Sequence, residues 1–211
     1  MARPREFNAE AALDRALEAL WMRGYEATSL DDLCAVTGLS RSSFYATFGS
    51  KRNLLLQSID RYVAQRNPRL AALLAQPMPV HDAFAALARQ FIDQIVAGPG
   101  RRGCFIGNCV AELPRSDRAA QARIRHALDT TEAIFRDALA RAKTRGELRD
   151  AADIGALARF LTAGFQGLRL VGKANPDRAT LEDIATVMLQ CLQQGSPDTE
   201  KSSTKGIGYD H

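Results

Sequence analysis

Side chains that donate hydrogen bonds gather near the start of the chain, between residues 28 and 52. All acidic residues of the first 52 lie before residue 33, so the stretch from Leu33 to Arg52 carries only positive charge. Arginine suits phosphate or a guanine edge, and the hydroxyls of serine and tyrosine suit phosphate or base edges. The net charge of +4 agrees with a polyanionic partner. The candidate nucleic-acid contacts are Thr28, Ser29, Arg41, Ser42, Ser43, Tyr45 and Lys51.

Two of the cations stand where a helix does not favour them. Lys51 and Arg52 occupy the first turn of a predicted helix, where the helix dipole disfavours positive charge by about 0.3–1 kcal/mol each. A phosphate bound at that helix start would reverse the penalty, through backbone N–H groups and both cations. Thr28 and Ser29 could hold a second phosphate in the same way at the start of another helix. The alternative is an ordinary helical hairpin with a solvated basic face.

The donors must be positioned by two short helices, which the sequence predicts over residues 30–37 and 41–47. Gly38 joins them and can adopt the positive φ that a tight turn requires. Phe44 and Phe48 lie four residues apart on one face, so both should point inward and leave Tyr45 on the outer face. Two short helices that cross at a glycine turn form a helix-turn-helix.

Helical signals dominate the remaining chain, because alanine, leucine and arginine are abundant and runs of β-branched residues are absent. Asn8 can cap a first helix that Gly24 ends. A fourth helix begins at Lys51, and the Asn67-Pro68 pair should bend or end it. The sequence therefore predicts an all-α fold of about nine helices. Those outside the short pair are expected over residues 9–23, 51–65, 80–97, 105–113, 117–144, 152–172 and 178–194.

The segment from Arg5 to about Tyr62 contains a long, ordered set of residues: Gly24-Tyr25-Glu26-Ala27-Thr28-Ser29, Gly38-Leu39-Ser40, Phe44-Tyr45 and Phe48-Gly49-Ser50-Lys51. In these residues the segment closely resembles the DNA-binding domain of the TetR family of transcriptional regulators. The resemblance implies that Tyr45 and Lys51 contact operator phosphates and that residues 41–43 face the major groove. One departure is Cys34, where the family usually has alanine, and a cysteine is small enough to be tolerated there.

The resemblance also implies an organisation and a function for the whole chain. A three-helix DNA-binding domain is expected over residues 5–66 and a helical ligand-sensing and dimerisation domain over residues 67–194. Residues 195–211 are polar and are expected to form a disordered tail. Such a protein would be a repressor that binds a palindromic operator as a homodimer in the cytoplasm. A small-molecule inducer, or modification of a thiol, would release it from DNA.

The alternative from another class is an enzyme or carrier built on a helical bundle. No acid–base pair, nucleophile–histidine arrangement or cofactor loop appears in the sequence, so neither enzymatic activity nor a cofactor is expected. The three histidines and four cysteines lack metal-ligand spacing, so no metal site is expected. No apolar run reaches the roughly 18–20 residues that span a bilayer, and the N-terminus lacks a signal-peptide pattern. No membrane partner is therefore expected.

Two apolar stripes on the last two predicted helices are candidates for a dimer interface. Regulators of this family typically dimerise through a four-helix bundle made of these two helices. Gly164 would let a partner helix approach closely, because glycine has no side chain. The alternative is that both stripes belong to the core of one protomer. The candidate interface residues are Phe160, Gly164, Leu168, Ile184 and Met188.

Cys104 is the candidate sensing residue. The segment Gly103-Cys104-Phe105-Ile106-Gly107-Asn108 is similar to one found in a TetR subgroup that includes cysteine-based electrophile sensors. At a helix N-terminus beside Arg101 and Arg102, the pKa of its thiol could be lowered and the thiolate favoured. Phe105 and Phe165 could line a ligand cavity. The alternatives are a small residue packed at a helix start and aromatic rings packed in a core.

Overall fold

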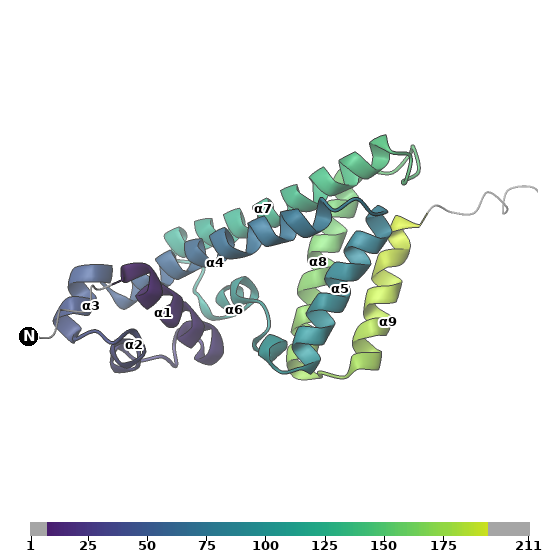
Figure 1. Ribbon diagram of the computed structural model, residues 1–211. Helices are drawn as coiled ribbons and strands as arrows, with labels where there is room; N and C mark the ends of the chain where they lie inside the picture. The colour runs from purple at the N-terminus through teal and green to yellow at the C-terminus, as the bar shows by residue number, and fades with distance from the viewer. Residues whose placement is uncertain (1–7, 194–211) are drawn as a thin grey trace, which may run out of the picture.

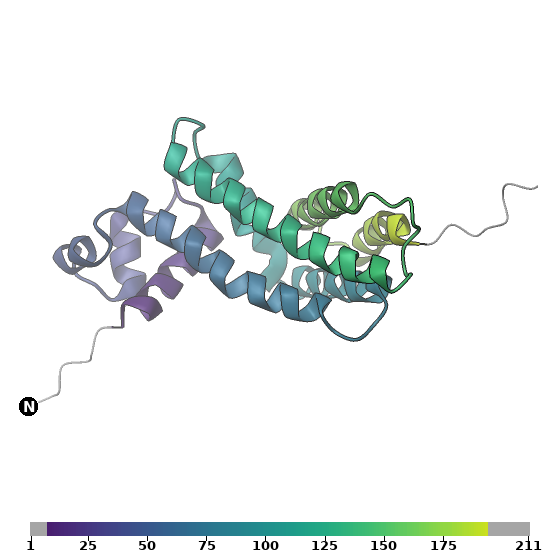
Figure 2. The same ribbon diagram turned by 90° about the horizontal axis from the view of Figure 1, so that it is seen from above.

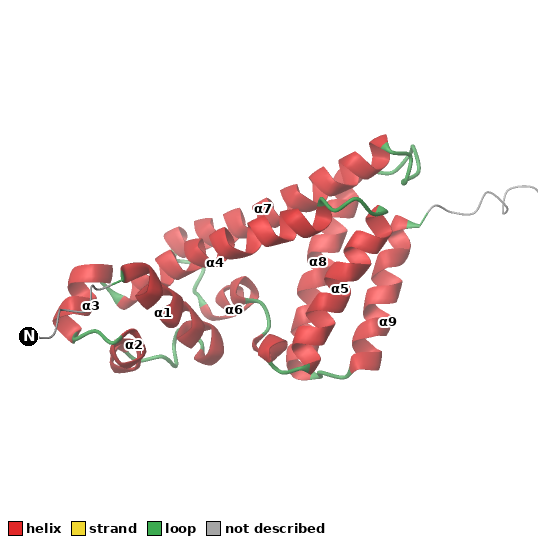
Figure 3. Ribbon diagram, in the orientation of Figure 1, coloured by secondary structure: helices red, strands yellow, loops and turns green. Residues whose placement is uncertain are grey.

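The computed structural model describes residues 8–193, and all regular structure in that range is helical (Figure 3). The all-α fold predicted from the sequence is therefore confirmed. No helix within these residues is both long and apolar enough to cross a membrane. The predicted tail, residues 195–211, lies outside the described part of the chain. The elements are α1 (Ala9–Arg23), α2 (Leu30–Thr37), α3 (Arg41–Phe48), α4 (Lys51–Leu74), α5 (Val80–Val96), the 3-10 helix η1 (Pro99–Arg102), α6 (Phe105–Glu112), α7 (Arg118–Thr144), α8 (Ile154–Ala174), α9 (Arg178–Leu189) and the 3-10 helix η2 (Gln190–Leu192).

The first helices begin where their capping residues stand. The Asn8 side chain accepts a hydrogen bond from the backbone N–H of Ala11, 3.0 Å away, and so caps α1. Ser29 caps α2 in a reciprocal capping box with Asp32. Gly38 follows α2 with φ of 73°, the left-handed conformation that the tight turn before α3 requires. The predicted Asn8 cap and the predicted turn at Gly38 are confirmed.

Buried apolar side chains hold the two short helices in place. Leu33 of α2 and Phe44 of α3 are fully buried in one cluster with the inward face of α1. The Arg15 guanidinium adds two hydrogen bonds, from Nε to the carbonyl of Val36 and from Nη2 to that of Thr37, each 2.9 Å long. These carbonyls end α2 without partners of their own helix, so Arg15 fixes the angle between α1 and α2.

Helix α4 is longer than the sequence predicts. It continues to Leu74 with Pro68 inside it, so the helix does not end at the Asn67-Pro68 pair and the predicted end near residue 65 is wrong. Proline removes only one N–H donor, and Pro68 is exposed, so water can satisfy the carbonyl that loses its partner. Leu70 and Leu74, beyond the proline, are buried in the core and hold the last turns in place.

Two clusters of buried apolar side chains form the interior. The first joins α1–α3 and the first half of α4 to α6 and the first half of α7. The second joins α5, α8 and α9 to the second halves of α4 and α7. Helices α4 and α7 run side by side along the molecule and connect its two ends, with α3 at one end and α9 at the other (Figures 1 and 2). The predicted boundary after residue 66 thus falls inside a helix that both clusters share.

Candidate nucleic-acid interface

The outer face of α3 carries the predicted donors. Phe44 and Phe48 are 0% and 3% exposed and turn inward, and Tyr45 is 51% exposed on the opposite face. The Tyr45 ring packs edge-on against Phe44, with ring centroids 6.0 Å apart, which orients the phenol outward. This is the orientation predicted from the spacing. The side chains exposed on this face are Arg41, Ser42, Ser43 and Tyr45.

Arg41 does not stand free on this face. Its Nε donates to Asp31 Oδ1 at 2.9 Å and its Nη2 to Asp31 Oδ2 at 2.7 Å. The hydrogen bond from Arg41 lowers the pKa of the Asp31 carboxyl, which stays ionised. The two side chains are 66% and 69% exposed, so the pair can open at little cost. This partner, which lies ten residues before Arg41 in the chain, was not predicted from the sequence.

The serine hydroxyls at the start of α3 form a small network. Ser40 Oγ accepts from the backbone N–H of Ser43 and so caps the helix. The same oxygen lies 3.0 Å from Ser42 Oγ and 2.9 Å from Ser43 Oγ. All three residues are exposed, so their hydroxyls can exchange these contacts for phosphate or base atoms.

The second predicted phosphate site, at the start of α2, is not supported. Thr28 is fully buried and its hydroxyl donates to the carbonyl of Gly24 at 2.6 Å. Ser29 is exposed, but its hydroxyl donates to the Asp32 carboxylate at 2.6 Å. With Asp31 and Asp32 in the first turn, negative charge already occupies the helix N-terminus. Thr28 therefore has a structural role, and exposure is the only feature that still favours Ser29 as a contact to DNA.

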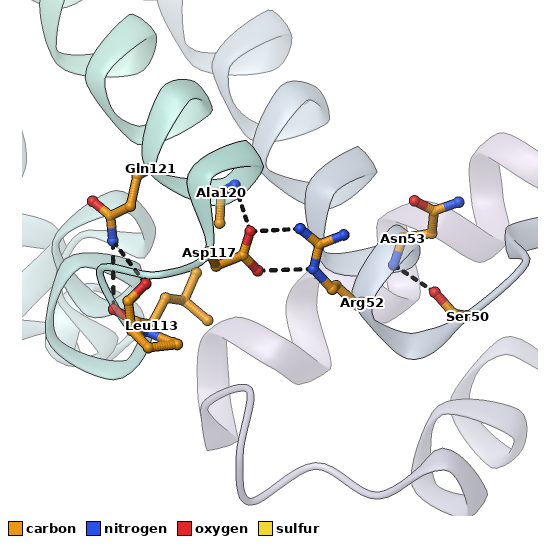
Figure 4. Close-up of polar contacts among 8 residues, drawn as sticks. Ser50, Arg52, Asn53, Leu113, Asp117, Ala120 and Gln121 are labelled. Atoms are coloured by element: carbon orange, nitrogen blue, oxygen red, sulfur yellow. Dashed lines mark hydrogen bonds and ion pairs between the residues drawn. The ribbon is translucent and has the colours of Figure 1, made fainter.

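The two cations at the start of α4 have different partners. Lys51 lies over the Tyr25 ring, with Nζ 4.4 Å from the centroid, and forms no ion pair with a described acidic residue. Arg52 donates to both carboxylate oxygens of Asp117, over 2.8 and 2.5 Å (Figure 4). The phosphate predicted to offset both cations is therefore not needed at Arg52. Lys51 remains a candidate contact.

Cys104 lies at the predicted helix start, but the cations near its thiol are not the ones that the sequence predicts. It is the N-cap of α6 and is buried, with Sγ 3.8 Å from the Tyr62 hydroxyl. Burial on its own raises the pKa of the thiol, but the guanidinium groups of Arg169 and Arg66, together with hydrogen bonds from the Gly107 backbone and the Tyr62 hydroxyl, lower it below its ordinary value. The expectation that Arg101 and Arg102 would act on the thiol is not supported. Arg102 instead lies over the Trp21 ring, 3.6 Å from its centroid.

The candidate aromatic residues belong to the core. Phe105 is 2% exposed and packs against Trp21 and Tyr62. Phe165 is 3% exposed and packs against Phe84, among other rings. Neither ring lines a described cavity, so their predicted role in ligand binding is not supported.

The candidate dimer residues divide into two groups. Leu168 and Met188 are buried within the protomer, and a Cβ added at Gly164 would collide with the Met188 side chain. These three residues pack α8 and α9 within one protomer, which corrects their assignment to a dimer contact. Phe160 is 51% exposed and Ile184 is half-buried, so both can reach a partner. Apolar residues that are also exposed on these helices are Leu170, Val171 and Val187.

Comparison with known sequences gives matches to both halves of the chain. The model described as bacterial regulatory proteins, tetR family, matches residues 12–57. The model described as Tetracyclin repressor-like, C-terminal domain, matches residues 81–188. The HTH-type transcriptional repressor ComR of Escherichia coli is 33% identical over 195 residues, which cover 89% of this chain and 90% of that protein. The uncharacterized HTH-type transcriptional regulator YezE of Bacillus subtilis is 31% identical, covering 91% of this chain and 100% of its own.

Solved structures agree with these matches. A cysteine mutant of the TetR family transcriptional regulator CifR, complexed with 26-base-pair operator DNA, is similar with a TM-score of 0.77 and 27% identity. The similarity covers 89% of this chain and 98% of that one. The reduced form of NemR from E. coli has the same fold, with a TM-score of 0.76, and is 21% identical over 85% of this chain and 94% of its own. The chain described here belongs to the TetR family of bacterial transcriptional regulators.

Proposed function

We propose that this chain is a repressor that binds a palindromic operator as a homodimer in the cytoplasm. A small-molecule inducer or modification of a thiol releases it. The observation that carries the proposal is the outer face of α3, where Arg41 and Tyr45 project outward over two buried phenylalanines. The family consists of transcriptional regulators, and CifR was solved with operator DNA.

Helix α3 has the size and chemistry of a recognition helix. Its eight residues fit the major groove, which admits one α-helix. Arg41 and Ser42, near its N-terminus, would reach base edges, and Tyr45 and Lys51 would reach the flanking phosphates. Arg41 must leave Asp31 to do so. Binding to DNA therefore replaces one exposed ion pair with contacts to DNA, whose phosphates carry a higher density of negative charge.

Dimerisation would use the exposed apolar side chains of α8 and α9. Phe160 and Val187 are 51% and 66% exposed, which is unusual for large apolar residues on helices that otherwise pack in a core. A second copy seated on this face would bury them. A two-fold dimer would then present two α3 helices to half-sites about 34–36 Å apart on one face of a palindrome.

Release would follow from a change in the spacing of the two α3 helices. An inducer that binds more tightly to a form with the wrong spacing shifts the protein toward that form. The fall in operator affinity is set by the difference between the inducer's affinities for the two forms. Helix α4 can transmit the change, because it begins beside α3 and ends in the second core cluster. Cys104 is adjacent to α4 through Tyr62, so modification of its thiol would push on the same helix.

The test is binding to the promoter region upstream of the chain's own gene, measured against random DNA at several salt concentrations. We expect specific binding that weakens steeply with salt, because each phosphate contact releases a counterion. Tyr45→Ala and Lys51→Ala should weaken this binding and leave the protein folded, and Lys51→Ala should lower the salt slope by about 1. Arg125→Ala, an exposed site on α7, serves as the matched control. No binding above random DNA at moderate salt would overturn the proposal.

A further inference from the structure

A cavity of about 390 Å³ lies between the two core clusters. Helices α1, α4, α5 and α8 contribute to its wall, together with η1. This volume falls within the range of roughly 300–1,000 Å³ that is typical of small-molecule sites. Its position is significant, because α1 belongs to the DNA-binding end of the molecule and α8 to the opposite end (Figure 1).

The wall of the cavity carries four arginines and one carboxylate. Glu18 forms an ion pair with Arg102 and so neutralises one of the four. Arg66, Arg69 and Arg169 form no ion pair with any acidic residue in the described part of the chain. The cavity therefore has a surplus of positive charge that no carboxylate of the described residues balances.

Neutral groups hold the two innermost guanidinium groups. Arg169 Nη1 donates to the Tyr62 hydroxyl at 3.3 Å, and the group lies 4.3 Å from the centroid of the Phe91 ring. Arg66 Nη1 donates to Thr131 Oγ1 at 3.0 Å. Tyr62 and Arg66 lie four residues apart on α4, so the Arg169 guanidinium, which contacts the Tyr62 hydroxyl, lies near that of Arg66. A half-buried arginine without a carboxylate keeps donors unused and favours any anion that can reach it.

The rest of the wall offers apolar contacts. Leu70 and Leu73 of α4 and Leu87 and Phe91 of α5 line the same cavity. A ligand that suits both parts has one anionic group and one apolar body. A carboxylate matches the guanidinium group best, because its two oxygens accept two parallel hydrogen bonds.

We propose that this cavity binds a small organic carboxylate, with the carboxylate at Arg169 and Arg66 and the apolar body against Leu87 and Phe91. The regulatory role of this binding rests on the function proposed above. Glu18 and Trp21 of α1 are part of the same wall, so a ligand in the cavity contacts the DNA-binding end of the molecule directly. Binding would therefore shift α1 and change the orientation of α3, which packs in the same core cluster.

Trp21 provides a direct readout of the cavity, because it is the only tryptophan in the chain and lines the wall beneath Arg102. The probes are straight-chain carboxylates from acetate to octanoate, with benzoate, each compared with its primary amide. We expect at least one carboxylate to change the Trp21 emission saturably, and its amide to bind at least about tenfold more weakly. Arg169→Gln and Arg66→Gln should each weaken the carboxylate about tenfold or more. Arg125→Gln on the outer face of α7 should leave it unchanged.

Three results would overturn the proposal: amides that bind as tightly as their acids, no response to any carboxylate at about 10 mM, or equal affinity in the cavity variants and the control. Circular dichroism checks the fold of each variant. If Arg169→Gln does not fold, Arg66→Gln carries the test on its own, because Arg66 is only half-buried. The titration needs no DNA. Carboxylate binding by a protein that fails to bind operator would therefore contradict the function proposed above and not the ligand class.

Discussion

Arg52 and Asp117 form a bidentate ion pair that joins the first turn of α4 to the N-cap of α7 (Figure 4). Asp117 also accepts a hydrogen bond from the backbone N–H of Ala120 at 3.0 Å. The pair thus connects, at their N-terminal ends, the two helices that run the length of the molecule (Figure 2). Any movement of α4 that reorients α3 must therefore either move α7 together with α4 or break this ion pair.

Replacing Asp117 tests this pair through its dependence on pH. Arg52 and two backbone N–H groups hold the pKa of the Asp117 carboxyl at about 2, below the value of about 3.9 in an unfolded chain. A carboxyl with a depressed pKa stabilises the fold above its unfolded pKa, and this stability is lost as the pH falls through the folded pKa. We expect Asp117→Asn to lower the urea midpoint slightly near neutral pH, because asparagine keeps the cap and loses the charge. The difference should shrink as the pH falls from about 4 toward 2.

Urea unfolding followed by circular dichroism measures this difference. Asp129→Asn is the matched control, because Asp129 is an exposed carboxyl on the same helix and forms no ion pair in the described chain. A difference between the parent and Asp117→Asn that is independent of pH would show that the charge of Asp117 does not stabilise the fold.

Asp31 should restrain DNA binding, because it holds the guanidinium group of Arg41. Asp31→Asn removes one negative charge from the DNA-facing end and frees Arg41. We expect it to raise the affinity for operator and for random DNA several-fold, because the gain is largely electrostatic. Arg41→Ala should instead lower operator affinity by about 1–3 kcal/mol, the range for losing a bidentate base contact.

Fluorescence anisotropy with operator and random DNA at matched salt measures both changes. Asp137→Asn on the second half of α7 changes net charge equally at an exposed site, at the end of α7 that lies far from α3 (Figure 1), and should have little effect. Equal affinities for the parent and Asp31→Asn would mean that Arg41 is not the contact that this ion pair restrains.

The sequence predicts the local features of this fold well, because they depend on neighbouring residues. The bounds of α1 and α2 follow from Asn8, Gly24, Ser29 and Gly38, and the structure has them at the predicted residues. Capping and positive φ act within one turn of chain, so residue type alone indicates them. The inward orientation of Phe44 and Phe48 follows from their spacing in the same way.

The missed features depend on residues that are distant in sequence. Asp117 is 65 residues from Arg52, and no local pattern connects them. The cations that act on Cys104 come from α4 and α8, whereas the sequence offered only its neighbours Arg101 and Arg102. Leu168 and Met188 have the spacing of an interface as well as of a core. Only the packing of α8 on α9 within one protomer distinguishes the two.

The exposed apolar side chains of α8 and α9 make the oligomeric state testable. We expect Phe160→Glu and Val187→Glu to convert the dimer to a monomer, because each would bury an unpaired charge in the interface. Both side chains are exposed in the protomer, so the fold should be retained. Operator affinity should fall at least about 100-fold, since two half-sites are no longer bound together.

Sedimentation equilibrium measures the mass of each variant. Met22→Glu is the control, because Met22 is 66% exposed on α1, away from α8 and α9. A parent chain that is monomeric, or a Phe160→Glu variant that stays dimeric, would exclude this face as the interface.

Cys104 and Cys109 should respond differently to electrophiles, although both are buried and lie five residues apart. Arg169 and Arg66 lower the pKa of the Cys104 thiol against the effect of burial. Burial, with the charge of Glu112, raises the pKa of Cys109 to about 12, so that thiol stays protonated and unreactive. We expect Cys104→Ser to bind operator normally and to lose release by N-ethylmaleimide, and Cys109→Ser to keep both.

Mass spectrometry of the labelled protein at a series of pH values separates reactivity from access. The labelling of Cys104 should reach its plateau at a lower pH than that of an ordinary thiol, because its thiolate forms at lower pH. Slow labelling with that same plateau would mean that access through the buried site limits the rate. If N-ethylmaleimide released Cys104→Ser as readily as the parent, the thiol would have no part in induction. N-ethylmaleimide would then act through another thiol, such as the half-buried Cys34 or Cys191, and a non-covalent ligand, such as the carboxylate proposed for the arginine-lined cavity, would be the candidate inducer.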